Sequence, residues 1–346
     1  MSQHILIPGP LLNEKGCPVQ AGYSTRPVMI YDRSMIKAGP MKIKEWDYYY
    51  TGNDEFGTAL TLADNSYMGI ISVSFLDFKK KKYKTVSRIN LFTMGKTKMP
   101  SSPLTGDVTC EKKDCYISFR HPDENTRRLV CMMKNFDENK DFECDITLGS
   151  PPEDFMTIVI PFHKNTKAFY YNVKINCMTA QGKLRCGNDE RTFDPASSMG
   201  LLDWGRGVWT YDNTWYWASL SARDENGTPF GFNLGYGFGD TSKATENMIF
   251  FDGKAHKTEH VIFSIPRSDK GKYLYTREWK ISSDDNRVNL RFTPVLDRTD
   301  NTDLLLLASL QHQVFGYFNG TLVKNNGDVI HVDNKLGFAE RVTNRW

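Results

Sequence analysis

The sequence lacks the features that mark several large classes of protein. Its first ten residues show neither the basic start nor the long apolar stretch of a secretory signal peptide. No run in the chain approaches the roughly 18 apolar residues of a membrane-spanning helix. Walker, HExxH and GxSxG motifs are absent. We therefore expect a soluble protein with no integral membrane contact, and no enzyme of the classes that depend on those motifs.

Cysteine is sparse, and its pattern predicts a compartment rather than a metal site. The seven cysteines are odd in number and share no CxxC spacing. Reduced thiols in the reducing cytoplasm are the simplest explanation. We therefore expect a cytoplasmic protein with no metal site and no cofactor.

An excess of charge of one sign is also missing. The chain has 44 basic and 41 acidic residues, which leaves a net charge of +3. Proteins that bind nucleic acid as their main partner usually carry a strongly basic stripe, so we expect no nucleic-acid partner. Nothing in the sequence defines an oligomeric state.

Large rings and short strand-like runs are abundant. The chain has 21 Phe, 16 Tyr and 7 Trp, residues that suit pleated, half-buried surfaces. The runs are separated by turn-forming pairs that tolerate the backbone of tight hairpins. These pairs are Asp64-Asn65, Gln181-Gly182, Asn226-Gly227, Asp252-Gly253 and Asn326-Gly327. The pattern predicts an all-β protein of barrels or sandwiches, with residues Asp303–His312 as the best candidate for one short helix.

Two aromatic hairpins suggest that the chain contains two related halves. Trp46–Tyr50 is followed by a polar turn and a second strand, and Trp215–Trp217 is followed in the same way by Arg223–Gly227 and Phe230–Phe232. Length alone also suggests two domains. We expect an N-terminal β domain over residues 1–165 and a C-terminal β domain over residues 166–346.

The segment Leu201–Asn247 is the densest in unusual residues. Four of the seven Trp lie within it. Because side chains alternate along a strand, Trp209 and Tyr211 should share one face, as should Trp215 and Trp217. This segment is the strongest candidate for a binding site.

The last part of this segment alternates glycine with rings. Residues Gly231, Gly235, Gly237 and Gly239 should lie on one face, interrupted only by Asn233. A glycine face leaves room for something bulky against the backbone. Either Trp side chains across the sheet or a flat ligand could fill that room.

Carboxyl groups in the same segment are candidates for acid–base chemistry. Asp203 either forms an ion pair with Arg206, which would lower its pKa, or lies among Trp rings without that partner, which would raise it. Glu246 is a second candidate. The sequence leaves both arrangements of Asp203 open.

The chain resembles the bacterial proteins grouped as the domain of unknown function 2804 family. The resemblance rests on Lys44–Tyr49, Asp203–Trp209, Asn233–Gly235, Glu246-Asn247 and the ending Gly337–Trp346. More distantly, the layout is similar to tandem lipocalin-like proteins that include carotenoid hydratases and fungal cyclases. That similarity implies two calycin-type antiparallel barrel domains with an apolar small molecule in a pocket, often at the domain junction. Some relatives protonate or hydrate double bonds with an Asp among rings, and Asp203 is the counterpart closest in character.

Three hypotheses for function follow. In the first, an aromatic-lined pocket binds an apolar or amphipathic small molecule, with Asp203 as acid if hydration, isomerisation or cyclisation occurs. The second is carbohydrate binding or cleavage by Trp stacking and a carboxylate pair. The third is a structural or partner-binding module whose rings pack without a cavity. For the first hypothesis, the expected lining is Trp204, Trp209, Tyr211, Trp215, Trp217 and Tyr236, with polar contacts from Asp203, Arg206, Asn233 and Glu246.

Overall fold

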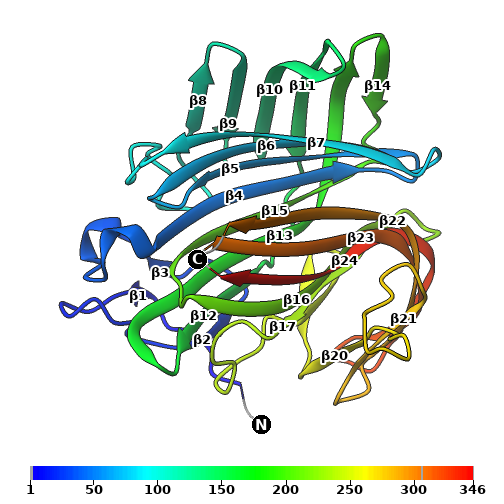
Figure 1. Cartoon of the computed structure of the whole chain (residues 1–346). Coiled ribbons are helices and arrows are strands. Elements are labelled where there is room, and N and C mark those ends of the chain that lie inside the picture. The colour runs from blue at the N-terminus through cyan, green and yellow to red at the C-terminus, as the bar shows by residue number, and fades with distance from the viewer. Residues whose placement is uncertain (1–2, 305–306, 346) are drawn as a thin grey trace.

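The structure is a computed structural model that describes residues 3–304 and 307–345. Two curled antiparallel sheets account for most of the chain, and the strands of the first sheet within residues 43–149 lie above the second sheet in Figure 1. Within the described residues, the only helices are two short 3-10 turns, η1 (Arg33–Met35) and η2 (Pro40–Lys42). No helix there is long and apolar enough to cross a membrane. The all-β prediction is confirmed.

The first sheet has 13 strands. Its main path, in spatial order, runs through β7 (Lys82–Leu91), β6 (Met68–Asp77), β5 (Phe56–Asp64), β4 (Ile43–Gly52), β15 (Met199–Val208), β13 (Asn165–Cys186), β11 (Lys140–Gly149), β10 (Thr126–Asp137), β9 (Cys115–Asp123) and β8 (Val108–Lys112). Three further strands join it through β13 or each other: β12 (Met156–Phe162), β14 (Asp189–Phe193) and β2 (Gly22–Ser24).

The second sheet has nine strands, and a separate pair of parallel strands lies near the N-terminus. The nine are, in spatial order, β19 (Lys254–Lys257), β18 (Met248–Phe251), β17 (Pro229–Tyr236), β16 (Asp212–Arg223), β24 (Val329–Arg345), β23 (Leu307–Val323), β22 (Val288–Leu304), β21 (Trp279–Ser283) and β20 (Val261–Ser264). The parallel pair is β1 (Gly9–Pro10) and β3 (Met29–Ile30).

The two sheets share one topology. Each begins with a meander (β4 to β7, and β16 to β19), continues into a second meander, and ends with a strand that returns to pair with the first: β15 with β4, and β24 with β16. Each sheet is therefore a half-barrel that remains open between the two meanders. The chain is built as two lipocalin-like units in tandem, as predicted.

Sheet membership bears on where the units divide. The expected boundary at residues 165 and 166 falls at the start of β13, and β13, β14 and β15 all belong to the first sheet. The chain passes to the second sheet between Val208 and Asp212. We propose that the division between the units lies there.

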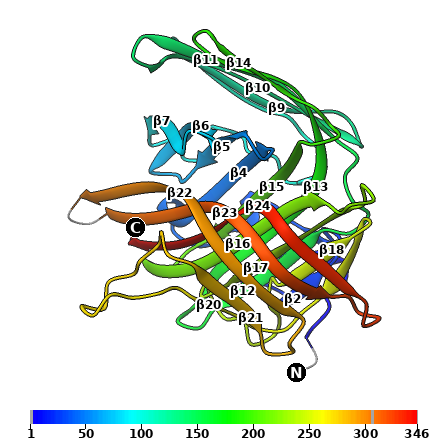
Figure 2. The same ribbon diagram turned by 90° about the vertical axis from the view of Figure 1, so that its right-hand side faces the viewer.

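A bend in β13 gives the first sheet its curl. The register shifts between Ile175 and Met178, and Cys177 has a φ of 61°. Its N–H is satisfied by Ser221 Oγ of the second sheet, 2.9 Å away. Such a bulge bends a strand and increases its twist. Beyond it, β13 rises to carry β8–β11 and β14 as the arch at the top of Figure 2.

The helix expected over Asp303–His312 is wrong. The described residues of this stretch belong to the long hairpin of β22 and β23, and residues 305–306 lie outside the described part. Thr299 pairs with His312 in this hairpin, and His312 pairs in turn with Arg341 of β24. This pairing on both sides of β23 satisfies the backbone, so tertiary context overrides the local helical pattern.

Four of the five predicted turn pairs join consecutive strands. Asp64-Asn65, Asn226-Gly227, Asp252-Gly253 and Asn326-Gly327 all lie at or between adjacent antiparallel strands. Gln181-Gly182 instead lies inside β13, where Gly182 has a φ of 135° and pairs with Ile146. There the glycine permits close approach, because an added Cβ would come 2.2 Å from the Asp145 carbonyl oxygen.

Candidate functional site

A buried polar layer lies where the two sheets pack together. Alternation along the strands directs the even-numbered residues of β4 and of the first half of β13, and the odd-numbered residues of β15, towards β16, β17 and β24. Asn176 joins the sheets directly, since its Nδ2 donates to Ser219 Oγ at 2.8 Å and to the Phe232 carbonyl oxygen at 3.2 Å. We call the layer formed by Asp203, Lys174, Glu246 and Glu340, with the rings around them, the inter-sheet site.

Asp203 lies in this layer and does not pair with Arg206. Its Oδ1 accepts from Asn172 Nδ2 at 2.6 Å and lies 3.9 Å from Lys174 Nζ, and its Oδ2 accepts from Trp46 Nε1 at 3.2 Å. Burial raises the pKa of Asp203 above its ordinary value, although Lys174 and Asn172 act in the opposite direction. Of the two arrangements that the sequence left open, the structure has the carboxyl group among rings.

Lys174 is the centre of the polar layer. Its Nζ donates to Glu246 Oε2 at 2.8 Å, Asn172 Oδ1 at 2.8 Å and Tyr170 Oη at 3.2 Å, so three acceptors match the three N–H bonds of an ammonium group. The same nitrogen lies 4.8 Å from the centre of the Trp217 ring. Burial acts to lower the pKa of Lys174, but the nearby carboxylates raise it above its usual value. The lysine is therefore held as a buried cation.

Glu246 fills the space that the glycine face leaves. Its Oε2 accepts from Asn233 Nδ2 at 3.1 Å, and an added Cβ at Gly235 would lie 2.5 Å from Glu246 Oε1. At Gly231 an added Cβ would meet Cys177 Sγ at 3.0 Å. The glycine face thus receives a carboxylate and a thiol from neighbouring segments, and Asn233 orients the carboxylate.

Glu340 is a third buried carboxyl group, which sequence reasoning missed. Its Oε1 accepts from Trp215 Nε1 at 2.9 Å, and its Oε2 accepts from Gln313 Nε2 at 3.1 Å and Gln311 Nε2 at 3.3 Å. Burial raises the pKa of Glu340 to about 7. Only the strand register, which places it opposite Trp217, brings this C-terminal residue into the layer.

Aromatic side chains enclose these polar groups. The rings are Trp46, Tyr48, Tyr170, Trp209, Trp215, Trp217 and Phe238. Trp46 stacks on Tyr170 with the ring centres 5.9 Å apart, and Trp209 meets Trp46 edge-on at 5.1 Å. Gly205 permits this arrangement, because an added Cβ would lie 1.9 Å from the Trp46 ring. The site therefore combines ring faces with carboxyl groups in a space removed from water.

The structure brings together six of the predicted site residues and separates four. Asp203, Glu246, Asn233, Trp209, Trp215 and Trp217 all lie in or beside the polar layer. Trp204 and Arg206 face the interior of the first half-barrel, and Tyr236 stacks on Tyr216 on the other face of β17. Tyr211 lies beyond the end of β15 and is 53% exposed. Because side chains alternate along a strand, the sequence alone could have placed Trp204 and Arg206 on the face of β15 opposite Asp203.

Arg206 organises a second buried network instead. Its Nη1 lies 3.0 Å from Asp47 Oδ1, and its Nε lies 4.0 Å from Glu45 Oε1. Its Nε and Nη2 also donate to the Pro100 carbonyl oxygen at 3.1 and 2.7 Å, and the guanidinium group lies 4.1 Å from the centre of the Trp204 ring. Because the side chain is fully buried, every one of these contacts compensates for lost hydration.

A cleft of about 370 Å³ opens between the sheets beside the site. Its inner wall includes Tyr50 and Phe338, and the Phe338 ring meets Trp217 edge-on at 4.8 Å. Ser219 and Arg223 add polar groups to the lining. Phe338 therefore both lines the cleft and contacts a ring of the inter-sheet site.

The buried Glu340 predicts a pH dependence of stability. Its pKa is raised from 4.5 to about 7, so between these values the folded state retains a proton that the unfolded state has lost. Stability therefore falls as pH rises from 4.5 to 7, by about 3 kcal/mol from this group. In Glu340→Gln this contribution should disappear, so the variant and the wild type should differ in pH slope. Urea denaturation at pH 5, 6, 7 and 8 measures it, and parallel pH profiles for the two proteins would contradict the prediction.

The fold and the site together define a tandem lipocalin-like protein with a ring-lined polar layer between its two units. The chain belongs to the family described as Domain of unknown function (DUF2804), whose model matches residues 2–346. No curated protein matches the chain.

Two solved structures have a similar fold. Kievitone hydratase from Nectria haematococca gives a TM-score of 0.54 at 12% identity, over 88% of this chain and 88% of that chain. A protein from Nitrosomonas europaea, provisionally described as an AttH, gives 0.54 at 12% identity, over 88% of this chain and 93% of that chain. At this level of identity the likeness shows the fold alone.

Proposed function

We propose that the protein binds an apolar or amphipathic small molecule at the inter-sheet site and carries out acid-catalysed chemistry on a double bond. Hydration, isomerisation or cyclisation would be the reaction class. The observation that carries the proposal is the enclosure of Asp203, Glu246 and Glu340 with Lys174 among aromatic rings. Burial raises the pKa of Asp203 and of Glu340, and carboxyl groups with raised pKa values in such a setting are characteristic of functional sites.

In this proposal Asp203 supplies the proton. A protonated carboxyl group transfers its proton to one carbon of the double bond, and the faces of Trp46 and Trp217 stabilise the cation that develops on the other. In a hydration, water then adds to that carbon and returns a proton to the carboxylate. Lys174, shared between Asp203 and Glu246, holds both side chains in place.

Kievitone hydratase supports the class of reaction, since its name describes a hydratase and its fold is similar. The support is by analogy of fold, and the residues above carry the argument.

We propose that ligands reach the site from the cleft beside Phe338, because that ring lines the cleft and contacts Trp217. We also propose that the protein is located in the cytoplasm. All seven cysteines are free thiols, as expected in a reducing compartment.

Asp203→Asn tests the proposal. The variant should lose turnover of any substrate found in a panel of terpenoids, polyenes and prenylated phenols, by at least a hundredfold, while its affinity for that substrate stays within a fewfold. Asp145→Asn is the matched control, because Asp145 is exposed on β11 and pairs with Arg128 at the surface. Unchanged turnover in Asp203→Asn would rule out this role for Asp203.

A further inference from the structure

A second cleft, of about 440 Å³, lies beside the end of β3 and the start of β4, which are both on the left in Figure 1. Its walls come from three separate segments: the end of β3 with η1, the start of β4, and the loop between β7 and β8. Glu45 lines this cleft from β4. It points away from Asp203, because Glu45 lies on the opposite face of β4 from Trp46, which contacts Asp203. This cleft is therefore distinct from the inter-sheet site.

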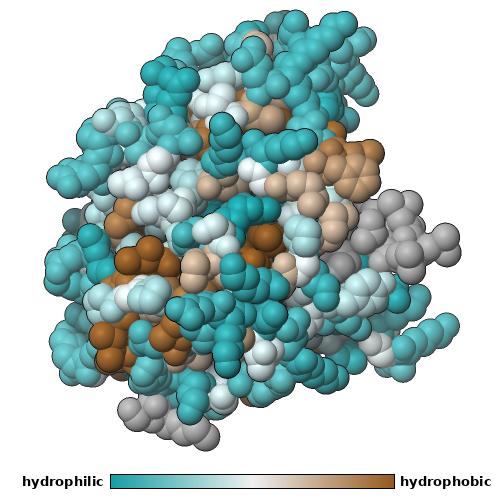
Figure 3. Space-filling model, turned by 90° about the vertical axis from the view of Figure 1, so that its left-hand side faces the viewer, coloured by the Kyte–Doolittle hydropathy of each residue, from teal (hydrophilic) through white to brown (hydrophobic). Residues whose placement is uncertain are grey.

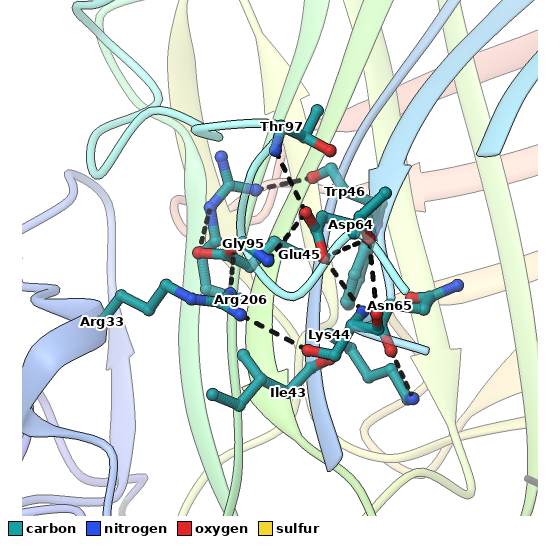
Figure 4. A network of polar contacts seen from close by, with 12 residues as sticks. Arg33, Ile43, Lys44, Glu45, Trp46, Asp64, Asn65, Gly95, Thr97 and Arg206 are labelled. Atoms are coloured by element: carbon teal, nitrogen blue, oxygen red, sulfur yellow. Dashed lines mark hydrogen bonds and ion pairs between the residues drawn. The ribbon is translucent and has the colours of Figure 1, made fainter. Parts of the chain in front are cut away.

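The loop that forms one wall is built around a buried carboxylate. Asp64 accepts from Thr93 Oγ1 at 2.8 Å, from Gly95 N at 3.0 Å and from Thr97 N at 3.3 Å. Figure 4 shows both of these backbone N–H groups directed at Asp64. The hydrogen bonds, led by that from Thr93, lower the pKa of Asp64 despite its burial, so the carboxylate stays ionised as the organiser of the loop.

The same loop has an unusual backbone. Phe92, Met94 and Lys98 have φ values of 55°, 50° and 54°, in the left-handed region that costs non-glycine residues about 1–3 kcal/mol each. Gly95 also has a positive φ, and an added Cβ there would lie 2.7 Å from Arg33 Nε. The loop is thus held in a costly shape that lets the guanidinium group lie directly against it.

The lining of the cleft carries two acids, Asp32 and Glu45, and two cations, Arg33 and Lys98. Arg33 pairs with Glu45, whose other carboxylate oxygen accepts from Tyr31 Oη at 2.8 Å. Arg206 lies behind Glu45 and is balanced by Asp47, and Figure 4 shows Arg33 and Arg206 at the same network.

Lys98 also lines the cleft and, in the described part of the chain, has no acidic group within 4 Å. Asp32 is the one other acid in the lining, and its Oδ1 is used to cap η1 through Ser34 N at 2.8 Å. Lys37 is a nearby cation whose charge also acts on Asp32. Among the described residues, Lys98 is therefore the cation of the lining that has no paired acid.

Apolar surface adjoins these cations. Ile30 is 68% exposed and Met99 lines the cleft, while Leu91 at the end of β7 and Phe92 at the start of the loop are 73% and 61% exposed. Figure 3 shows this face of the molecule, with apolar side chains gathered among polar ones. Solvent-exposed apolar groups beside a defined cleft are typical of a binding site.

We propose that this cleft binds a small amphipathic monocarboxylate. The carboxylate is held between Arg33 and Lys98, and the apolar body lies over Ile30 and Met99. A carboxylate would give Lys98 the acidic partner that the described residues do not supply, and Arg33 already binds a carboxylate here in the form of Glu45. The volume lies within the range of small-molecule sites. This proposal does not depend on the function proposed for the inter-sheet site.

Calorimetric titration with octanoate and with 1-octanol tests the proposal. Octanoate should bind, and 1-octanol, which has the same chain without the charge, should bind at least tenfold more weakly. Lys98→Gln should weaken octanoate binding about tenfold, and Arg33→Gln should weaken it further. Lys96→Gln is the matched control, because Lys96 is exposed on the same loop and does not line the cleft. In the control variant the affinity should not change.

Several results would overturn the assignment. Absence of octanoate binding, equal affinity for 1-octanol, or an equal loss in Lys96→Gln and Lys98→Gln would each do so. Because Lys98 is exposed, Lys98→Gln should fold normally even if Arg33→Gln does not. Octanoate binding that is abolished by Trp217→Ala and kept in Lys98→Gln would place the ligand at the inter-sheet site instead.

Discussion

Replacing Lys174 with Met should lower the free energy of unfolding by about 3–5 kcal/mol. The substitution keeps most of the side-chain volume but leaves two buried acids, Glu246 and Asp203, without their cation. Breaking a buried ion pair by removing one partner is costly for this reason, whereas replacing both partners is often tolerated. Urea denaturation followed by Trp fluorescence measures the loss.

The double variant Lys174→Met/Glu246→Gln separates charge from packing. It should recover at least half of the stability lost in the single variant, because one of the uncompensated charges is gone. Lys183→Met is the surface control, since Lys183 pairs with Glu190 where both side chains are exposed, and it should cost under about 1 kcal/mol. A Lys174→Met variant as stable as this control would mean that the polar layer is hydrated.

Arg206→Met should be comparably destabilising, again by about 3–5 kcal/mol. The guanidinium group donates to Asp47 and to the Pro100 carbonyl oxygen, and the variant leaves these acceptors buried and unpaired. Arg206→Lys should recover little, because an ammonium group cannot reproduce the planar set of donors. Thermal and urea unfolding measure both variants.

The control for Arg206 is another arginine of the same sheet. Arg128 pairs with Asp145 in a two-pronged contact, but both side chains are about half exposed. Arg128→Met should therefore change stability by under about 1 kcal/mol. Equal losses at Arg128 and Arg206 would contradict the claim that burial sets the cost at Arg206.

The sequence was informative about the fold because local patterns define strands and turns. Turn pairs such as Asn226-Gly227 and the two aromatic hairpins identified consecutive antiparallel strands directly. The domain boundary expected at residues 165 and 166 stays a prediction, and the return of β15 to β4 is a long-range pairing that gives no local signal in the sequence. The same kind of pairing, of β22 with β23, replaced the helix expected at Asp303–His312.

The candidate site was partly predictable for the same reason. Asp203, Trp215 and Trp217 could be found because they lie close together in an unusual segment. Lys174 and Glu340 could not, because they come from strands far away in sequence and meet Asp203 and Trp217 only through sheet register. A carboxylate with a raised pKa is visible only once burial is known.

The central claim is that the inter-sheet site accepts an apolar small molecule, and titration of intrinsic Trp fluorescence tests it most directly. The wild type, Trp217→Phe and Lys98→Gln would each be titrated with a fatty acid, a terpenoid, a polyene and a panel of oligosaccharides. We predict saturable quenching by a member of the apolar set, unchanged in Lys98→Gln and at least tenfold weaker in Trp217→Phe. Saturable quenching by an oligosaccharide alone would favour a carbohydrate site. No saturable response to either class would contradict the claim and favour rings that only pack the two sheets together.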